Sequence, residues 1–276
     1  MKILKNLGLL ALSAIIAFGL SACGEEKEKA QTESKSGKKN EVIVGATPIP
    51  HGQILEFIKE DLQKEGVNLK IIEFTDYVTP NISLHDKSLD ANFMQHKPYL
   101  DSINKDRGYG LVSIAEIHLE PIGLYSTKYK SIDSLPDGAR IAIPNDVTNG
   151  GRALILLHNQ GLITLKDVTN LGSTESDIVQ NPKGLKIIPI DGALLPRVVD
   201  EYDGAVINGN YALQAGFKSK DAILLEDKKS PYANILVVRE ESVNDENIAK
   251  LKKALQSEKV KEFIINTYDG EVIPAF

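Results

Sequence analysis

Apolar positions after residue 40 follow first the spacing of a strand and then the spacing of a helix. EVIVGAT is a short apolar run bounded by Gly and Pro, which predicts a buried strand. Four apolar residues at helical spacing follow: Ile54, Leu55, Ile58 and Leu62. Gly66 stands where this helix would end. The pattern therefore predicts a strand followed by an amphipathic helix.

The same alternation continues along the first half of the chain. We expect strands in VNLKIIEF and at 91–94, helical stretches at 79–87 and 98–105, and two adjacent strands, GLVSIAEI and EPIGLYS. Repeated β-α-β units favour a mostly parallel sheet with helices on both faces.

After the turn-rich segment KYKSIDSLPDG the order starts again. ARIAIP, LKIIPI and GAVIN are expected strands, each followed by a helical stretch, and NILVVRE with two amphipathic helices in 245–268 closes the chain. We expect an α/β protein of two lobes, 41–126 plus 233–276 and 127–232. The chain would cross between the lobes twice, near Tyr125 and near Asn234. Two lobes with two connections form a cleft that suits a small ligand.

The N-terminus has the features of a secretory signal followed by a lipid anchor. An apolar run at 7–20 follows Lys2 and Lys5 and ends in Ser-Ala-Cys, so residues 1–22 are an expected signal peptide, too short to span a membrane comfortably. Cys23 is the only cysteine, and its position favours lipidation over a place in the core. We expect the protein to be held on a cell membrane and to face the periplasm or the cell exterior.

Residues 23–40 are dense in charge and poor in apolar residues, which predicts a disordered tether; a solvated helix over the first half is the alternative. The formal net charge is −6, and the signal peptide removes only Lys2 and Lys5. Basic residues are interleaved with acids, so we expect no nucleic-acid partner. A single cysteine excludes an internal disulfide and a thiolate zinc site.

No motif of an enzyme is present. The chain has no GxSxG, no HExxH and no glycine-rich phosphate loop, and its one cysteine is expected to be lipidated. We therefore expect neither catalysis nor a cofactor.

Candidate binding residues begin with Asn149 and Arg152, in the sequence NGGRALILL. Asn149 is a natural helix N-cap, which would place Arg152 in the first turn. A guanidinium beside free backbone N–H groups would suit a carboxylate or a phosphate. The alternative is an arginine that faces solvent.

A second cluster combines aromatic rings with an imidazole: Tyr77, Phe93, His96 and Tyr99. These residues would suit an apolar or thioether side chain, or they could be ordinary core. A metal is not expected, because the remaining histidines lie far away in sequence and no HxH or HxxxH spacing occurs.

Two asparagines, Asn208 and Asn234, complete the candidate set. Asn208 follows a strand and Asn234 stands at the second crossing, although both positions also suit simple turn formers. Together with Arg152 they would satisfy a zwitterion, the guanidinium taking the carboxylate and amide carbonyls taking the ammonium group.

Five segments carry a resemblance to a known family: NFMQHKPYL, EPIGLYS, IAIPNDVTNGGRAL, AVINGNYA and SPYANIL. In this order and spacing the chain resembles the methionine-binding lipoproteins of bacterial ABC importers. The resemblance implies a two-lobed periplasmic-binding-protein fold of type II-like organisation and a monomer that delivers L-methionine, or D-methionine, to a permease driven by an ATPase.

Carried over by motif, the resemblance implies that Arg152 binds the carboxylate, that Asn208 and Asn234 bind the polar end, and that Tyr77, Phe93, His96 and Tyr99 enclose the side chain. Asn149 is a weaker candidate. Another small amino acid, a short methionine-containing peptide, or a surface adhesin lipoprotein are the alternatives.

Overall fold

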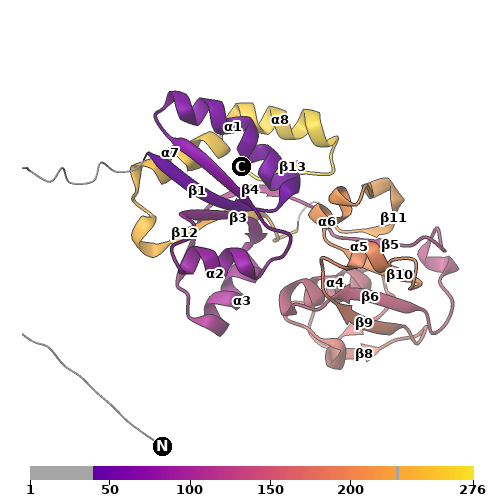
Figure 1. Cartoon of the computed structure of the whole chain (residues 1–276). Helices are drawn as coiled ribbons and strands as arrows, with labels where there is room; N and C mark the ends of the chain where they lie inside the picture. Colours follow the sequence, from indigo (N-terminus) through magenta and orange to yellow (C-terminus); the bar gives the residue numbers. More distant parts are fainter. Residues whose placement is uncertain (1–39, 228–229) are drawn as a thin grey trace, which may run out of the picture. The chain divides into compact units, whose positions relative to one another are not determined.

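The computed structural model describes residues 40–227 and 230–276, and these hold two large β-sheets with their helices and a small two-stranded sheet (Figure 1). The expected signal peptide, Cys23 and nearly all of the tether lie outside the described residues. The hydrophobic cores described below lie within 40–276, so a form that begins after Cys23 retains every contact described below. No helix in the described part of the chain combines the length and the apolar composition needed to cross a membrane.

The first lobe is built on a six-stranded sheet with the order β13-β4-β12-β3-β1-β2. Its strands are β1 (Glu41–Ala46), β2 (Asn68–Glu73), β3 (Ala91–His96), β4 (Leu111–Leu119), β12 (Asn234–Arg239) and β13 (Ile273–Pro274). Strand β1 runs parallel to β2 and β3, whereas β12 is antiparallel to β3 and β4.

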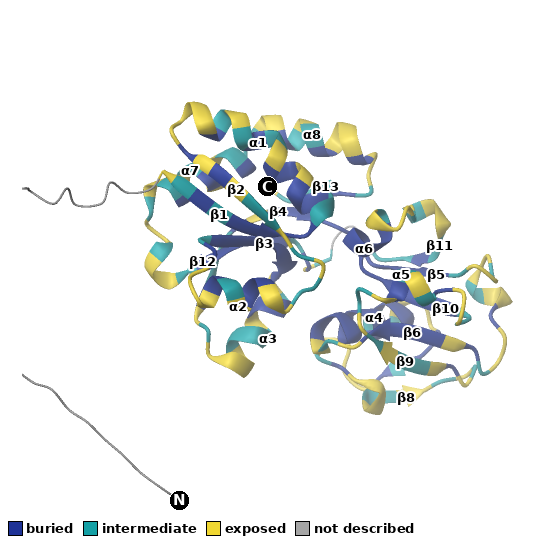
Figure 2. Cartoon of the chain, in the orientation of Figure 1, coloured by how far each residue is buried: buried dark blue, intermediate teal, exposed yellow. Residues whose placement is uncertain are grey.

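Helices cover both faces of this sheet (Figure 1). They are α1 (Gln53–Lys64), α2 (Thr79–His85), α3 (Lys97–Arg107), α7 (Glu246–Leu255) and α8 (Glu258–Tyr268), with a helical turn at Pro48–Gly52. The apolar stripes of α1, α7 and α8 share one core, while Leu84 of α2 and Leu100 of α3 belong to another. Figure 2 shows the result, with buried strands between helices whose outer faces are exposed. Helix α1 ends before Gly66, whose φ of 81° a side chain would disfavour.

The second lobe is built on a five-stranded sheet with the order β11-β5-β10-β6-β9. Its strands are β5 (Gly123–Tyr125), β6 (Arg140–Pro144), β9 (Lys186–Ile190), β10 (Gly204–Ile207) and β11 (Ala222–Leu225), and its helices are α4 (Val147–Asn159), α5 (Leu195–Val198) and α6 (Gly209–Gln214). Helix α4 packs in one core, and α5 and α6 pack in another. A small hairpin pairs β7 (Thr164–Leu165) with β8 (Ile178–Gln180). Short 3₁₀ turns occupy Ile132–Ser134, Glu175–Asp177, Ser219–Asp221 and Glu240–Ser242.

The predicted α/β fold with two connections between the lobes is confirmed, with two corrections. Each sheet mixes parallel and antiparallel pairs, so the expectation of a mostly parallel sheet is wrong: the connections that re-enter a sheet add strands antiparallel to their neighbours. The first crossing lies at 120–122 rather than near Tyr125, because Tyr125 pairs with Ala205 in the second sheet. The second connection runs from the end of β11 to Asn234, as expected.

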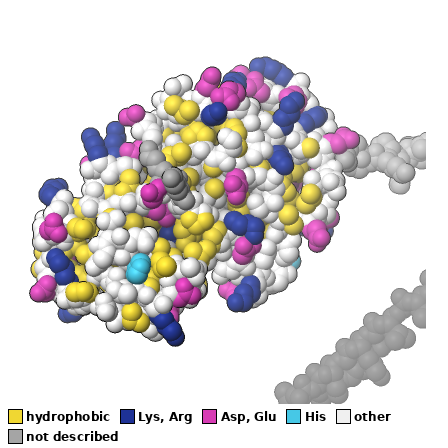
Figure 3. Space-filling view, turned by 180° about the vertical axis from the view of Figure 1, so that it is seen from behind, with side chains coloured by type: hydrophobic (Ala, Val, Ile, Leu, Met, Phe, Trp, Pro, Cys, Tyr) yellow, Lys and Arg dark blue, Asp and Glu magenta, His cyan; other side chains and the backbone are white. Residues whose placement is uncertain are grey.

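Acidic and basic side chains are interspersed over the face seen in Figure 3, with apolar atoms between them. This distribution agrees with the interleaved charges along the sequence. The chemistry that distinguishes the protein lies instead between the lobes.

Candidate functional site

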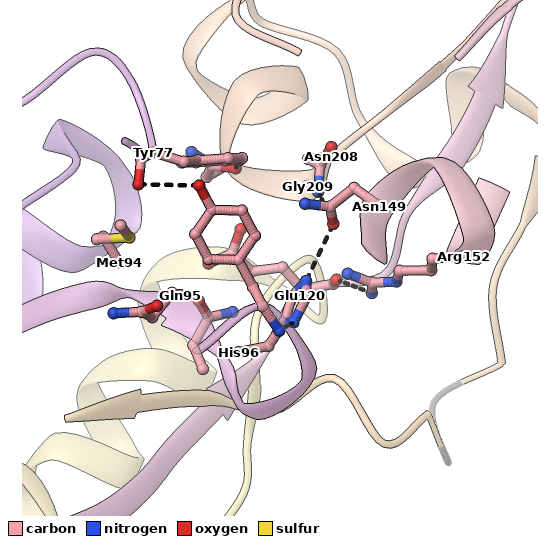
Figure 4. Close-up of a pocket in the computed structure, with 12 residues that line it drawn as sticks. Tyr77, Met94, Gln95, His96, Glu120, Asn149, Arg152, Asn208 and Gly209 are labelled. Atoms are coloured by element: carbon pink, nitrogen blue, oxygen red, sulfur yellow. Dashed lines mark hydrogen bonds between the residues drawn. The ribbon is translucent and has the colours of Figure 1, made fainter. Parts of the chain in front are cut away.

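A cavity lies between the two lobes and encloses about 340 Å³, counting the part that is open to solvent (Figure 4). The lining residues come from both lobes and both connections: Tyr77, Met94, Gln95, His96, Tyr99, Glu120, Asn149, Arg152, Asn208, Gly209, Asn210 and Asn234. The fold therefore brings together every predicted binding residue except Phe93.

His96 joins the first lobe to the second. It caps α3, because its Nδ1 accepts a hydrogen bond of 3.2 Å from the backbone N–H of Tyr99. Its Nε2 lies 3.0 Å from Oδ1 of Asn149 on the other lobe. Burial, together with the nearby Arg152 guanidinium, lowers the pKa of His96 to about 3. The imidazole is therefore neutral at physiological pH, with its proton on Nε2 pointing at Asn149.

Two tyrosines extend the first-lobe wall. Tyr77 donates to Oδ1 of Asn210 at 2.6 Å and stacks on Tyr211 with ring centroids 4.8 Å apart. The hydroxyl of Tyr99 donates to the backbone oxygen of Tyr77 at 3.2 Å. Because Asn210 and Tyr211 belong to the second lobe, the two contacts that Tyr77 makes with them also hold the lobes together at the cavity.

Phe93 is not among the residues that line the cavity, and its predicted place in the aromatic box stays a prediction. The side chain is fully buried in the first-lobe core, with its ring edge against His51 and His118. The neighbouring Met94 lines the cavity instead. A β-bulge explains the exchange: Leu236 pairs with Phe93 and Ile235 with Gln95, so Met94 is the extra residue, and bulges re-aim side chains.

Arg152 lines the cavity, although not for the reason given by the sequence. Asp146, not Asn149, caps α4 by accepting from the backbone N–H of Asn149 at 2.9 Å. Arg152 therefore stands in the second turn of the helix rather than at its N-terminus. Its side chain is only 3% exposed, which rules out the alternative of a solvent-facing arginine.

The Arg152 guanidinium is held from several sides. Its Nε donates to Oε1 of Glu226 at 2.9 Å, and its Nη2 donates both to the other Glu226 oxygen and, at 2.9 Å, to the backbone oxygen of Glu120. The ring of Tyr232 lies 4.3 Å from the guanidinium carbon. Figure 4 shows the guanidinium reaching from α4 toward the cavity. A fixed cation at a cavity wall suits a ligand carboxylate.

Asn149 and Asn208 form a chain of amides. Asn149 donates from Nδ2 to the Asp146 carboxylate at 3.0 Å and accepts at Oδ1 from Nδ2 of Asn208 at 2.8 Å. Among the described residues, Oδ1 of Asn208 and Nδ2 of Asn210 are buried without a hydrogen-bond partner. Buried polar atoms without partners are costly, so two cavity-lining residues offer an acceptor and a donor for a ligand.

Asn234 presents the opposite end of its amide from the one expected. Its Oδ1 lies 3.0 Å from Nε2 of His51, whose Nδ1 lies 2.7 Å from the Thr47 hydroxyl. The carbonyl is therefore engaged, and the amide nitrogen is the atom that remains for a ligand. Asn208 can accept from an ammonium group as predicted, whereas Asn234 is placed to donate.

Sequence reasoning missed Glu120, although it singled out the segment EPIGLYS. Glu120 is 4% exposed, lines the cavity, and lies beside His51 and His118, two histidines set aside as too distant in sequence. Met94, Gln95, Gly209 and Asn210 were also missed. Their segments are named in the family resemblance, so the signal was the motif rather than the individual residue.

The cavity can bind a small zwitterion chemically. It offers a cation at Arg152, a carbonyl oxygen at Asn208, and a wall of aromatic and thioether side chains. Among the described lining residues there is no serine, threonine, cysteine or lysine, which are the common nucleophiles of covalent catalysis. The arrangement therefore suits binding.

Comparisons with known proteins agree with this chemistry. Residues 42–276 match the model of a family described as NlpA lipoprotein. The D-methionine-binding lipoprotein MetQ of Escherichia coli is 43% identical over 267 residues, 95% of this chain and 96% of that protein. The resemblance to methionine-binding lipoproteins is confirmed.

Solved structures share the fold. A nutrient-binding protein from Burkholderia cenocepacia, solved bound to methionine, is 47% identical, with a TM-score of 0.83 over 85% of this chain and 100% of that chain. An ABC transporter periplasmic substrate-binding protein from Coxiella burnetii is 44% identical, with a TM-score of 0.81 and the same coverage of 85% and 100%. A family of transport-associated binding lipoproteins is not a family of enzymes.

Proposed function

This chain belongs to the NlpA lipoprotein family, and from that premise we propose that it is a substrate-binding protein that captures methionine between its lobes for an ABC importer. One observation carries the proposal: the cavity joins a buried cation and two unpartnered amide atoms to a wall of aromatic and thioether side chains. Methionine has the matching groups in one small molecule.

The ligand is placed by chemical complementarity. Its carboxylate would meet Arg152 and the amide nitrogen of Asn234, and its ammonium group would meet Oδ1 of Asn208. The thioether would lie against Tyr77, Met94 and Tyr99, since sulfur packs favourably at ring edges. Side chains of both lobes border the cavity, so we expect a single amino acid to fit it better than a peptide.

Calorimetry tests the ligand. A form lacking residues 1–23 would be unfolded, washed free of bound small molecules and refolded, and then titrated with L-methionine, D-methionine and a Gly-Met dipeptide. We expect methionine to bind and to raise the unfolding temperature, and the dipeptide to bind more weakly. A refolded protein that gives no heat and no stabilisation with either enantiomer would overturn the proposal.

The protein would work as a lipid-anchored monomer beside a permease and its ATPase. A lipid on Cys23 would confine the lobes near the membrane, and more than one acyl chain is needed for stable attachment. Cys23→Ala should leave methionine binding unchanged and release the protein from the membrane fraction. Persistent membrane attachment of this variant would contradict the anchor.

A further inference from the structure

Three buried ionisable side chains meet at the first connection between the lobes. Nε2 of His118 lies 2.6 Å from Oε1 of Glu120, and Nε2 of His51 lies 3.4 Å from the same oxygen. His51 and His118 are at most 1% exposed. Figure 4 includes Glu120 among the residues that line the cavity, so the cluster borders the binding site at this residue.

Both histidines are neutral, and His118 donates to the carboxylate. Burial lowers the pKa of His51 to about 4 and that of His118 to about 3. The Thr47 hydroxyl can donate to Nδ1 of His51, which leaves the proton on Nε2 for Oδ1 of Asn234, while the His51 ring lies beside Glu120. Glu120 thus receives hydrogen bonds from uncharged partners, and the side chain of the nearest cation, Arg152, is paired with Glu226.

A buried carboxylate without a paired cation is costly. The segment Asn208–Asn210 packs directly on Glu120: a Cβ at Gly209 would lie 2.6 Å from the Glu120 Cβ, and the backbone N–H of Asn210 donates to the carboxylate. The unpartnered Oδ1 of Asn208 comes from the same segment. An acceptor and a buried negative charge therefore border the same part of the cavity.

We propose that Glu120, held by His51 and His118, is the receptor for the ammonium group of the ligand and couples ligand capture to the release of a proton. This inference rests on the proposed function and specifies it: the ligand must carry a cationic amine. Charges would then alternate across the site, from Glu120 to the ammonium group, the ligand carboxylate, Arg152 and Glu226.

The sign of the coupling follows from electrostatics. Burial raises the pKa of the Glu120 carboxyl in the protein without ligand, while an adjacent ammonium group would lower it. Ligand binding to the protonated carboxyl therefore expels a proton, and affinity falls as the pH drops through the raised pKa. The ionisable groups that face Glu120 are His51, His118, Arg152, Tyr77 and Tyr268. Burial lowers the pKa of both histidines and raises the pKa of both tyrosines, so the raised pKa of the Glu120 carboxyl sets the sign of the coupling.

The first experiment uses the unmodified protein without residues 1–23. Calorimetric titrations with methionine and with its des-amino analogue, 4-(methylthio)butanoic acid, would be made near pH 7. We expect the analogue to bind at least about tenfold more weakly, the scale of a lost charged hydrogen bond. The methionine titration is then repeated at steps of falling pH, each in two buffers of different ionisation heat, which counts the protons released on binding. Equal affinity for the two ligands, or no proton release, would overturn the proposal.

The second experiment compares Glu120→Gln with Glu116→Gln, an exposed glutamate on β4, the strand that ends just before Glu120. Glu120→Gln should lose most of the preference for methionine over the des-amino analogue and all proton release, whereas Glu116→Gln should match the unmodified protein. If the unmodified protein bound methionine and Glu120→Gln kept the full preference for methionine over the des-amino analogue, the role of Glu120 would be refuted and the proposed function would stand. Absence of methionine binding by the unmodified protein would refute the proposed function.

Discussion

Replacing Arg152 with alanine is the most direct perturbation of the binding site. The guanidinium makes charge-assisted hydrogen bonds to Glu226 and to the backbone oxygen of Glu120, and it is the cation offered to the ligand carboxylate. A hydrogen bond to a charged group contributes about 1.5–3 kcal/mol, so losing the ligand contact alone should weaken methionine binding by roughly 10- to 150-fold. The variant should also unfold more easily, because Glu226 loses the partner of its largely buried charge.

Calorimetry and urea unfolding separate these two effects. Arg152→Lys keeps the charge but loses the planar fork, so it should recover part of the stability and little of the affinity. Arg107→Ala, at the exposed end of α3, is the matched control and should alter neither quantity. If folded Arg152→Ala protein bound methionine with the affinity of the unmodified protein, Arg152 would not be the carboxylate receptor.

Three further predictions test the cavity and its supports. Phe93→Ala should destabilise the fold by about 3–5 kcal/mol in urea unfolding, whereas Met94→Ala should chiefly reduce methionine affinity; the reverse pattern would contradict the bulge. Stability should fall as the pH is lowered from about 6.5 toward 4. Burial keeps His51, His96 and His118 unprotonated in the folded protein, with pKa values of about 4, 3 and 3, whereas the unfolded chain takes up these protons. An unfolding temperature that does not change with pH would refute this. Gly151→Ala should cost about 1–3 kcal/mol, because its Cβ would lie 2.2 Å from the Leu171 backbone oxygen; Gly192→Ala, whose nearest atom lies at 3.5 Å, is the control.

The helices and the longer strands could be predicted because the apolar positions within each element repeat at the spacing of a helix or of a strand. The apolar face of α1 is the clearest case, since Ile54, Leu55, Ile58 and Leu62 are all buried. Some strands of two to four residues, such as β7 and β11, were missed because so few positions show no periodicity, whereas β5 and β10 lie in predicted apolar runs. Strand direction was also beyond the sequence, because it depends on which neighbour a strand joins.

The binding residues also divide into those that the local sequence predicts and those that depend on the fold. Residues such as His96 and Asn208 could be predicted because they stand at the ends of predicted elements, where open sheets present ligand contacts. Phe93 lies in the first-lobe core, and the bulge that makes Met94 the extra residue depends on pairing with β12, which the local sequence does not specify. Arg152 lines the cavity although it does not stand in the first helical turn as predicted, and its partner Glu226 lies 74 residues away along the chain. Contacts between residues so far apart along the chain depend on the fold and are not indicated by the local sequence.

The two connections between the lobes are part of the binding site as well as its link. Glu120 comes from the first connection, and Glu226 and Tyr232 come from the second, and all three hold Arg152. The contacts that join the lobe surfaces are different ones and include those of His96 with Asn149 and of Tyr77 with Asn210. If the lobes separated, these latter contacts would break first, while Arg152 would keep the partners that set its position. The carboxylate receptor would therefore stay formed in an open protein, and a ligand bound there would supply the surface on which the first lobe closes.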